Sequence, residues 1–285
     1  PRCRADDPSP DRPPGRPPSP AATGAGERPE RVKTFLLSEL VRRDFRGRYA
    51  GSFFGLAWSF AHPLWQLALF SFVFSFVLRI PLTGERTEHF ALFLFCGLLP
   101  WMALHEGVAR GATAITDNAM LVKKLSFPSE LLPLTVVLTA ALHLLIGLGL
   151  FIPILALVGD LSPGSLPWLL LALPLQLALT AGLALLLAAV NVAVRDTSQL
   201  LGIALQAWFY LTPIVYPQAL MPERVRGWLL FNPAAALVGL YRQALIGGAA
   251  PEPAALAALV IAAGALLALG LFVFRRARPT FADEI

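Results

Sequence analysis

Long uncharged apolar stretches recur along most of this chain, and they constrain its fold more than any other feature. Of the 285 residues, 56% are hydrophobic and 14% are charged, whereas an ordinary soluble domain has about 25% charged residues. A soluble domain of this length could not bury so much apolar surface. The sequence therefore predicts an all-α polytopic membrane protein. It argues against a soluble enzyme, a nucleic-acid-binding domain and a disulfide-stabilised secreted protein.

Six of these runs are long enough to cross a bilayer, which takes about 20 mostly apolar residues. They lie at 49–78, 90–114, 131–159, 168–194, 197–217 and 253–274. Residues 218–252 contain only shorter apolar stretches, which we interpret as one or two half-inserted helices. With the N-terminal tail left out of the count, thirteen lysines and arginines lie on the side of the termini and five lie on the other side. Because positively charged residues gather in cytoplasmic loops, this excess predicts that both termini are cytoplasmic.

Two further segments precede the first span. Residues 1–30 are rich in proline and poor in large apolar residues, which predicts a disordered tail. Residues 31–48 have apolar residues at helical spacing but too many charges to span, which favours an amphipathic helix in the cytoplasmic headgroup layer. A short soluble helix is the alternative. The permease domain would then cover 49–278, with a cytoplasmic C-terminal tail at 279–285.

Residues that could carry catalysis or bind a nucleotide are missing from the expected spans and loops. The sequence has no G-x-x-x-x-G-K-[ST] loop to hold phosphates, and its one Asp-Asp pair lies in the tail. The ionisable residues expected within the membrane are His62, Glu106 and His143. Glu106 stands four residues before Arg110, so we expect a local ion pair, and we expect the histidines to pack or form hydrogen bonds. We therefore expect no nucleotide, cofactor or metal site in this chain.

The first predicted span carries an aromatic stripe. Its members recur at steps of four and seven residues, which places them on one helical face. This face could pack against other helices or face lipid, or it could border a route on which sugar rings stack. The predicted substrate-path residues are Tyr49, Phe54, Trp58, Trp65, Phe72 and Phe76.

The loop after the second span suggests a docking element. Asp117 or Asn118 could cap a short helix that presents Met120 and Leu121, and Pro128 would end it. Exposed apolar residues on a short helix in the cytoplasm are typical of a protein contact. A plain connector is the alternative.

Four segments resemble the integral-membrane subunit of type-2 ABC exporters, in the branch that exports polysaccharides. They read ELVRRDFRGRYAGSFFGLAWSFAHPLW (39–65), ITDNAMLVKKLSFPSELLPL (115–134), LTPIVYP (211–217) and FNPAAALVGLYRQALIGG (231–248). Their order and spacing agree with a family that includes permeases for O-antigen, capsule, galactan and teichoic acid. The resemblance covers residues 31–278, nearly everything but the tail.

The resemblance implies a homodimer of six-span subunits in the bacterial plasma membrane, with two separate ATPase subunits that bind ATP and magnesium. It assigns Arg42, Arg43, Asp44, Arg46 and Arg48 to the interface helix and its gate loop. It assigns Asp117, Asn118, Met120, Leu121, Lys123, Lys124, Phe127 and Pro128 to the helix that couples to the ATPase. It assigns Tyr216, Pro217, Asn232, Pro233, Tyr241 and Arg242 to an external gate of re-entrant helices.

Together these features predict ATP-driven export of an undecaprenyl-linked polysaccharide. The expected partners are a second copy of the chain, the two ATPase subunits, the polysaccharide and membrane lipids, without nucleic acid. A type-2 ABC exporter of a drug or another small amphiphile is the first alternative. A membrane-embedded glycosyltransferase has less support, because the expected spans lack the acidic residues that such a site needs.

Overall fold

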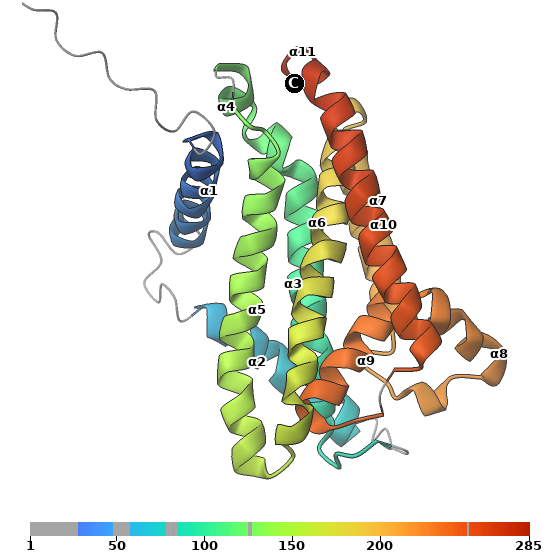
Figure 1. Cartoon of the computed structure of the whole chain (residues 1–285). Coiled ribbons are helices and arrows are strands. Elements are labelled where there is room, and N and C mark those ends of the chain that lie inside the picture. Colours follow the sequence, from blue (N-terminus) through green and yellow to red (C-terminus); the bar gives the residue numbers. More distant parts are fainter. Residues whose placement is uncertain (1–27, 48–57, 78–81, 83–84, 125–126, 250) are drawn as a thin grey trace, which may run out of the picture.

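The computed structural model describes residues 28–47, 58–77, 82, 85–124, 127–249 and 251–285, and every regular element within these ranges is helical. Four long helices form the body of the molecule (Figure 1): α3 (Phe90–Asp117), α5 (Leu131–Val158), α6 (Leu169–Ala193) and α10 (Pro253–Ala277). At about 1.5 Å per residue, each is longer than the roughly 30 Å hydrocarbon core of a bilayer. The described part of the chain is therefore a polytopic α-helical membrane protein, with four helices long and apolar enough to cross.

The central helix is α3, which packs against both α5 and α6, while α6 also packs against α10. Two glycines allow the close contact between α6 and α10, because a Cβ on Gly182 or Gly270 would overlap backbone atoms of the other helix. Buried hydroxyls are satisfied within their own helices, since Thr135, Thr139 and Thr180 each donate to the carbonyl four residues earlier. The core thus needs few polar contacts between helices, as expected in lipid.

Two predicted spans correspond to shorter helices. The first includes α2 (Trp58–Ser71) followed by the π-helical turn η2 (Phe72–Val77), and its earlier residues lie outside the described ranges. The fifth contains α7 (Thr197–Leu211), which ends at Leu211 rather than at Pro217. The extended backbone of Thr212 explains this end, because a residue before a proline is disfavoured in the helical region.

The α-helix of the predicted fourth span begins next to Trp168, although the helical segment that is apolar enough to cross extends back to Pro163. A 3₁₀ segment, η3 (Pro163–Trp168), leads directly into α6 at Leu169. It follows Gly159, whose left-handed backbone (φ 90°) ends α5. Such a conformation is one that glycine adopts without steric cost.

Short elements cover the two ends of the bundle (Figure 1). One end carries α4 (Ala119–Lys124), η6 (Arg278–Thr280) and α11 (Phe281–Glu284). Towards the other end lie η4 (Gln218–Leu220), α8 (Glu223–Arg226), η5 (Gly227–Phe231) and α9 (Pro233–Ile246). We call these the α4 end and the α9 end. Helix α9 is largely buried, and its 14 residues are too few to cross a bilayer.

The predicted amphipathic helix is α1 (Arg28–Gly47), which packs against α5 (Figure 1). Its apolar residues Leu36, Leu37 and Leu40 are half-buried, whereas Arg42 and Arg43 are exposed. The helical amphipathic character predicted for 31–48 is therefore present over 31–47.

Candidate coupling and transport site

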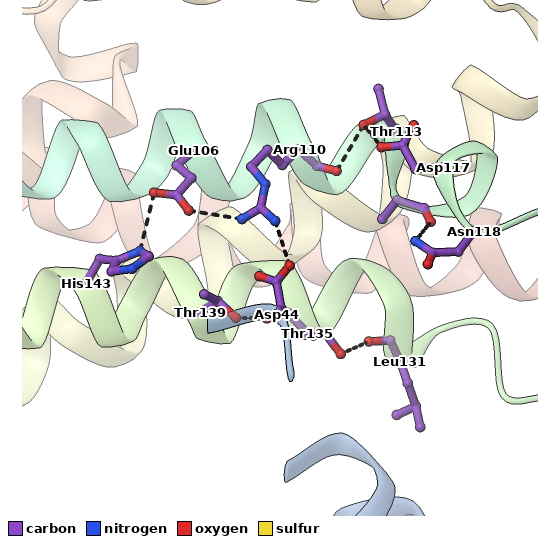
Figure 2. Close-up of polar contacts among 11 residues, drawn as sticks. Asp44, Glu106, Arg110, Thr113, Asp117, Asn118, Leu131, Thr135, Thr139 and His143 are labelled. Carbon is purple, nitrogen blue, oxygen red and sulfur yellow. Dashed lines mark hydrogen bonds and ion pairs between the residues drawn. The ribbon is translucent and has the colours of Figure 1, made fainter. Parts of the chain in front are cut away.

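A charged cluster joins three helices (Figure 2). Arg110 on α3 donates through Nη1 to Oε1 of Glu106 at 3.1 Å, and through Nη2 to Oδ1 of Asp44 on α1 at 2.7 Å. The other carboxylate oxygen of Glu106 lies 3.5 Å from Nδ1 of His143 on α5. The cluster therefore links α1, α3 and α5 through side chains that are mostly shielded from solvent.

The expected local pair between Glu106 and Arg110 is confirmed. Sequence reasoning missed its two further members, Asp44 and His143, because they come from other helices. His143 also packs its ring against Phe45, with 5.3 Å between ring centroids. The sequence does offer one signal for the contribution of α1. Residues 42–48 are mostly arginine, and Asp44 and Phe45 are the acidic and the aromatic residue among them.

The other described residues assigned to the interface helix lie away from this cluster. Arg42, Arg43 and Arg46 are exposed on α1, and Arg48 lies outside the described ranges. Exposed arginines at the end of such a helix suit contact with anionic headgroups. Asp44 is thus the member of this set that attaches α1 to the bundle.

The predicted coupling helix exists as α4, with its two apolar residues in different environments. Met120 is 63% exposed, whereas Leu121 is half-buried and packs with Val122 and Phe127 against a buried apolar cluster. Lys123 is exposed and Pro128 is half-buried. Met120 is therefore the exposed large apolar side chain of α4, and Leu121 holds α4 to the bundle.

The expected side-chain cap of this helix is wrong. Asp117 accepts a hydrogen bond from Thr113 at 2.7 Å, and the Asn118 amide donates to the Ala114 carbonyl at 2.9 Å (Figure 2). Both side chains therefore stabilise the last turn of α3. The first turn of α4 is instead joined to the backbone carbonyl of Asn118, which accepts from Leu121 and Val122.

The described part of the aromatic stripe lies on the surface. Trp58, Trp65, Phe72 and Phe76 are all more than half exposed, with Trp65 at 70%. Phe72 and Phe76 stack nearly parallel, with 6.0 Å between ring centroids. The other two predicted path residues, Tyr49 and Phe54, lie outside the described ranges. An exposed stack of this kind can contact lipid, another chain or a sugar ring.

Asn232 connects α7 to the start of α9. Its side-chain oxygen caps α9 by accepting from the amides of Ala234 and Ala235, and it also accepts from the Trp208 indole at 2.8 Å. Its amide nitrogen donates to the Thr212 hydroxyl at 3.1 Å. Pro233 occupies the first turn of α9, where its missing N–H is not needed.

The remaining residues assigned to the external gate divide into two groups. Tyr216 lies in the segment after α7 and donates to the Tyr210 carbonyl at 2.7 Å, and Pro217 is buried next to it. Tyr241 and Arg242 are buried within the protomer, with Tyr241 fully inaccessible. The last two therefore do not line an exposed surface of the protomer.

Arg242 holds the segment after α7 in place. Its guanidinium donates to the carbonyls of Pro213 and Ile214, each at 2.8 Å, and lies 3.7 Å from the ring centroid of Phe93. These contacts satisfy carbonyls that the early end of α7 leaves without helical partners. Burial raises the pKa of Glu85, in the loop before α3, and the positive charge of Arg242 opposes that rise.

The fold and these residues define a general class of protein. Among the described residues, no group of three or more His, Cys, Asp or Glu side chains could hold a metal ion. Asp44, Asn232 and Arg242 each connect separate helices or loops, whereas Met120 and the described aromatic residues of the stripe are exposed. The arrangement is that of a membrane-embedded helical protein.

Comparison with known proteins gives the family. The model of the ABC-2 type transporter family matches residues 36–246. The O-antigen export system permease protein RfbA of Myxococcus xanthus is 32% identical over 257 residues, which cover 88% of this chain and 95% of that protein. The Klebsiella pneumoniae protein of the same name is 29% identical over 87% of this chain and 94% of its own length. The polysialic acid transport protein KpsM of Escherichia coli is 24% identical over 86% of this chain and 94% of its own length.

The chain belongs to the ABC-2 type transporter family, because the family match covers well over half of it. It is accordingly a transport permease and not an enzyme. The expected family resemblance is confirmed.

Proposed function

We propose that this protein is the membrane subunit of an ATP-driven exporter that carries an undecaprenyl-linked polysaccharide across the bacterial plasma membrane. The observation that carries the proposal is the near full-length similarity to permeases named for O-antigen export, at up to 32% identity. The similarity to a polysialic acid transport protein extends the shared cargo to a second kind of polysaccharide.

The proposed assembly is a homodimer with two ATPase subunits, which bind ATP and magnesium. Each protomer has six spans, with the segment containing α2 and η2 as the first and α7 as the fifth. Both termini face the cytoplasm, α1 lies at the cytoplasmic face of the membrane, and α9 is a re-entrant helix at the external face. The short length and burial of α9, and the amphipathic character of α1, support this arrangement.

Helix α4 is the proposed contact with the ATPase. Its exposed Met120 next to the exposed Lys123 supports this role, because an apolar side chain with a charged neighbour is typical of the centre and rim of a protein contact. Met120→Asp places an unpaired charge in that contact, which costs about 1–3 kcal/mol of binding. The variant should lose co-purification of the ATPase and export together.

The exposed aromatic face of α2 and η2 is the proposed border of the translocation route. Flat apolar faces suit sugar rings, whose C–H faces stack while their hydroxyl groups stay hydrated. The same face would also accept a small amphiphile, which makes an exporter of drugs or other amphiphiles the second candidate. Measurement of surface polymer separates the two.

The deciding experiment is a deletion strain in which surface polysaccharide and lipid-linked intermediates are both measured. Loss of surface polymer with accumulation of the intermediate inside the cell supports the proposal, and restoration by the plasmid-borne gene completes the control. A deletion strain with normal surface polymer would refute it. Single cysteines at Glu88 and Lys123 test the orientation, and a membrane-impermeant thiol reagent should label only the former from outside.

A further inference from the structure

The C-terminal end of the chain folds back onto the segment that contains α4. Phe281 on α11 is 1% exposed and stacks edge-to-face on Phe274 of α10, with 5.1 Å between ring centroids. Both rings belong to the buried cluster against which Leu121, Val122 and Phe127 pack. Helices α11 and α4 are in direct contact at the same end of the bundle (Figure 1).

Arg278 adds a polar connection between the same two regions. Its Nη1 lies 3.2 Å from Oε2 of Glu130, at the start of α5, and its Nη2 donates to the Phe127 carbonyl at 3.3 Å. The side chain of Arg278 is 43% exposed and that of Glu130 is 27% exposed. An ion pair this open to solvent contributes little to overall stability. Its effect is to fix where the chain between α4 and α5 lies.

Helix α4 depends on such contacts for its position. Its six residues are far too few to form a stable helix alone, since an isolated helix needs about 12–15 residues. One end of α4 is held by the backbone of Asn118, and its inner face is held by the cluster that contains Phe281. The chain beyond α4 is held at Phe127 by Arg278.

We propose that the C-terminal segment, through Arg278 and Phe281, holds α4 in the position in which it receives the ATPase. Both are positioning residues, and this role rests on the proposed function of α4. The segment also gives α4 a direct mechanical connection to α10, in addition to its covalent connections to α3 and α5. A displacement of α4 by the ATPase therefore acts on three long helices at once.

The test is a charge exchange between Arg278 and Glu130, measured as affinity of the full-length permease in nanodiscs for its cognate ATPase subunit. Arg278→Glu and Glu130→Arg should each weaken ATPase binding about tenfold, an effect within the usual range for coupled sites. The double exchange Arg278→Glu/Glu130→Arg should largely restore binding, because it rebuilds the pair with reversed polarity. Arg276→Glu is the matched control, since Arg276 is an exposed arginine two residues before Arg278, in the last turn of α10.

Two further measurements separate positioning from folding. The melting temperature of Arg278→Glu should equal that of the wild type, because the pair is solvent-exposed. A spin label at position 120 should report a broadened distance distribution to a second label on α10 in Arg278→Glu, and a narrow one again in the double exchange. A purely structural role would change melting without this reversible change in the placement of α4.

The outcomes distinguish this inference from the proposed function. If Met120→Asp abolishes ATPase binding while the Arg278 and Glu130 variants bind normally, α4 is the contact and the positioning role is wrong. If Arg276→Glu weakens binding as much as Arg278→Glu, or the double exchange does not recover, net charge or another defect explains the result and the inference fails. If Met120→Asp binds the ATPase normally, the proposed role of α4 fails instead.

Discussion

Arg110 is the side chain whose loss should most weaken the attachment of α1 to the bundle. It donates to Glu106 and Asp44 at 3.1 and 2.7 Å, and it is the one cation in that cluster whose charge is permanent. Asp44→Ala removes one acceptor and leaves Arg110 paired with Glu106. Arg110→Ala removes the shared partner and leaves two carboxylates without it. We therefore expect the two variants to differ in severity.

The magnitudes follow from geometry and exposure. A hydrogen bond between charged groups contributes about 1.5–3 kcal/mol. Because the Arg110 side chain is 37% exposed and that of Asp44 is 24% exposed, solvent screening reduces this to roughly 1–2 kcal/mol. Asp44→Ala should thus raise the undocked population of α1 about tenfold. Arg110→Ala should weaken the attachment of α1 by about 2–4 kcal/mol. The larger cost arises because the carboxylates of Asp44 and Glu106, which are largely shielded from solvent, both lose their main cation.

Hydrogen exchange of α1 in nanodiscs measures this attachment directly. Exchange of the α1 amides should accelerate in the order wild type, Asp44→Ala, Arg110→Ala, while exchange in α3 and α6 stays slow. Arg43→Ala is the control, since it removes an exposed charge next to Asp44 on the same helix. A double-mutant cycle between Asp44 and Arg110 should give a coupling of about 1–2 kcal/mol. Unchanged α1 exchange in Arg110→Ala, with the protein folded, would refute the reasoning.

Three further substitutions test packing and the transport route. Gly270→Ala should destabilise the protein by about 2–3 kcal/mol in a detergent unfolding assay, because the new methyl group overlaps α6. The control is Gly264→Ala on the same helix, whose methyl group meets open space and should be neutral or mildly stabilising. Arg242→Met should lower the free energy of unfolding by about 3–4 kcal/mol in the same assay, since two loop carbonyls and the Phe93 ring lose their contact with the guanidinium. A melting temperature like that of the wild type would contradict this expectation. Trp65→Leu should reduce polymer export with normal protein level and ATPase assembly, as checked by surface staining and co-purification, and full export would place the stripe against lipid.

Features set by local sequence were predictable. Hydropathy located α3, α5 and α10 to within a few residues, because each is a single, mostly apolar run bounded by polar or helix-breaking residues. The Glu106–Arg110 pair was predictable because helical periodicity alone brings residues four apart together. The short helix after the second span was also predictable from local sequence, although its expected side-chain cap does not form.

Features that depend on the packing of distant segments were not predictable. Asp44 reaches Arg110 across 66 positions, and Arg278 reaches Phe127 across 151, so no local pattern signals either contact. Matching motifs placed Arg242 in an external gate, yet whether a residue on a short helix is buried depends on the helices around it. Met120 and Leu121 are equally apolar, and only the position of the cluster under α4 decides which one is exposed.

The two ends of the bundle are stabilised in different ways, and this bears on how a movement could pass between them. Towards the α4 end, partly exposed ion pairs attach α1 and the C-terminal segment, and opening either contact costs about 1–2 kcal/mol or less. At the α9 end, the buried guanidinium of Arg242 fixes the start of the loop after α7, so breaking it costs far more. Helix α7 itself buries only Leu201 and Leu205 along its length. A force applied at α4 should therefore rearrange α1 and the exposed faces of α2 and α7 before it disturbs the packing of α9 against α3.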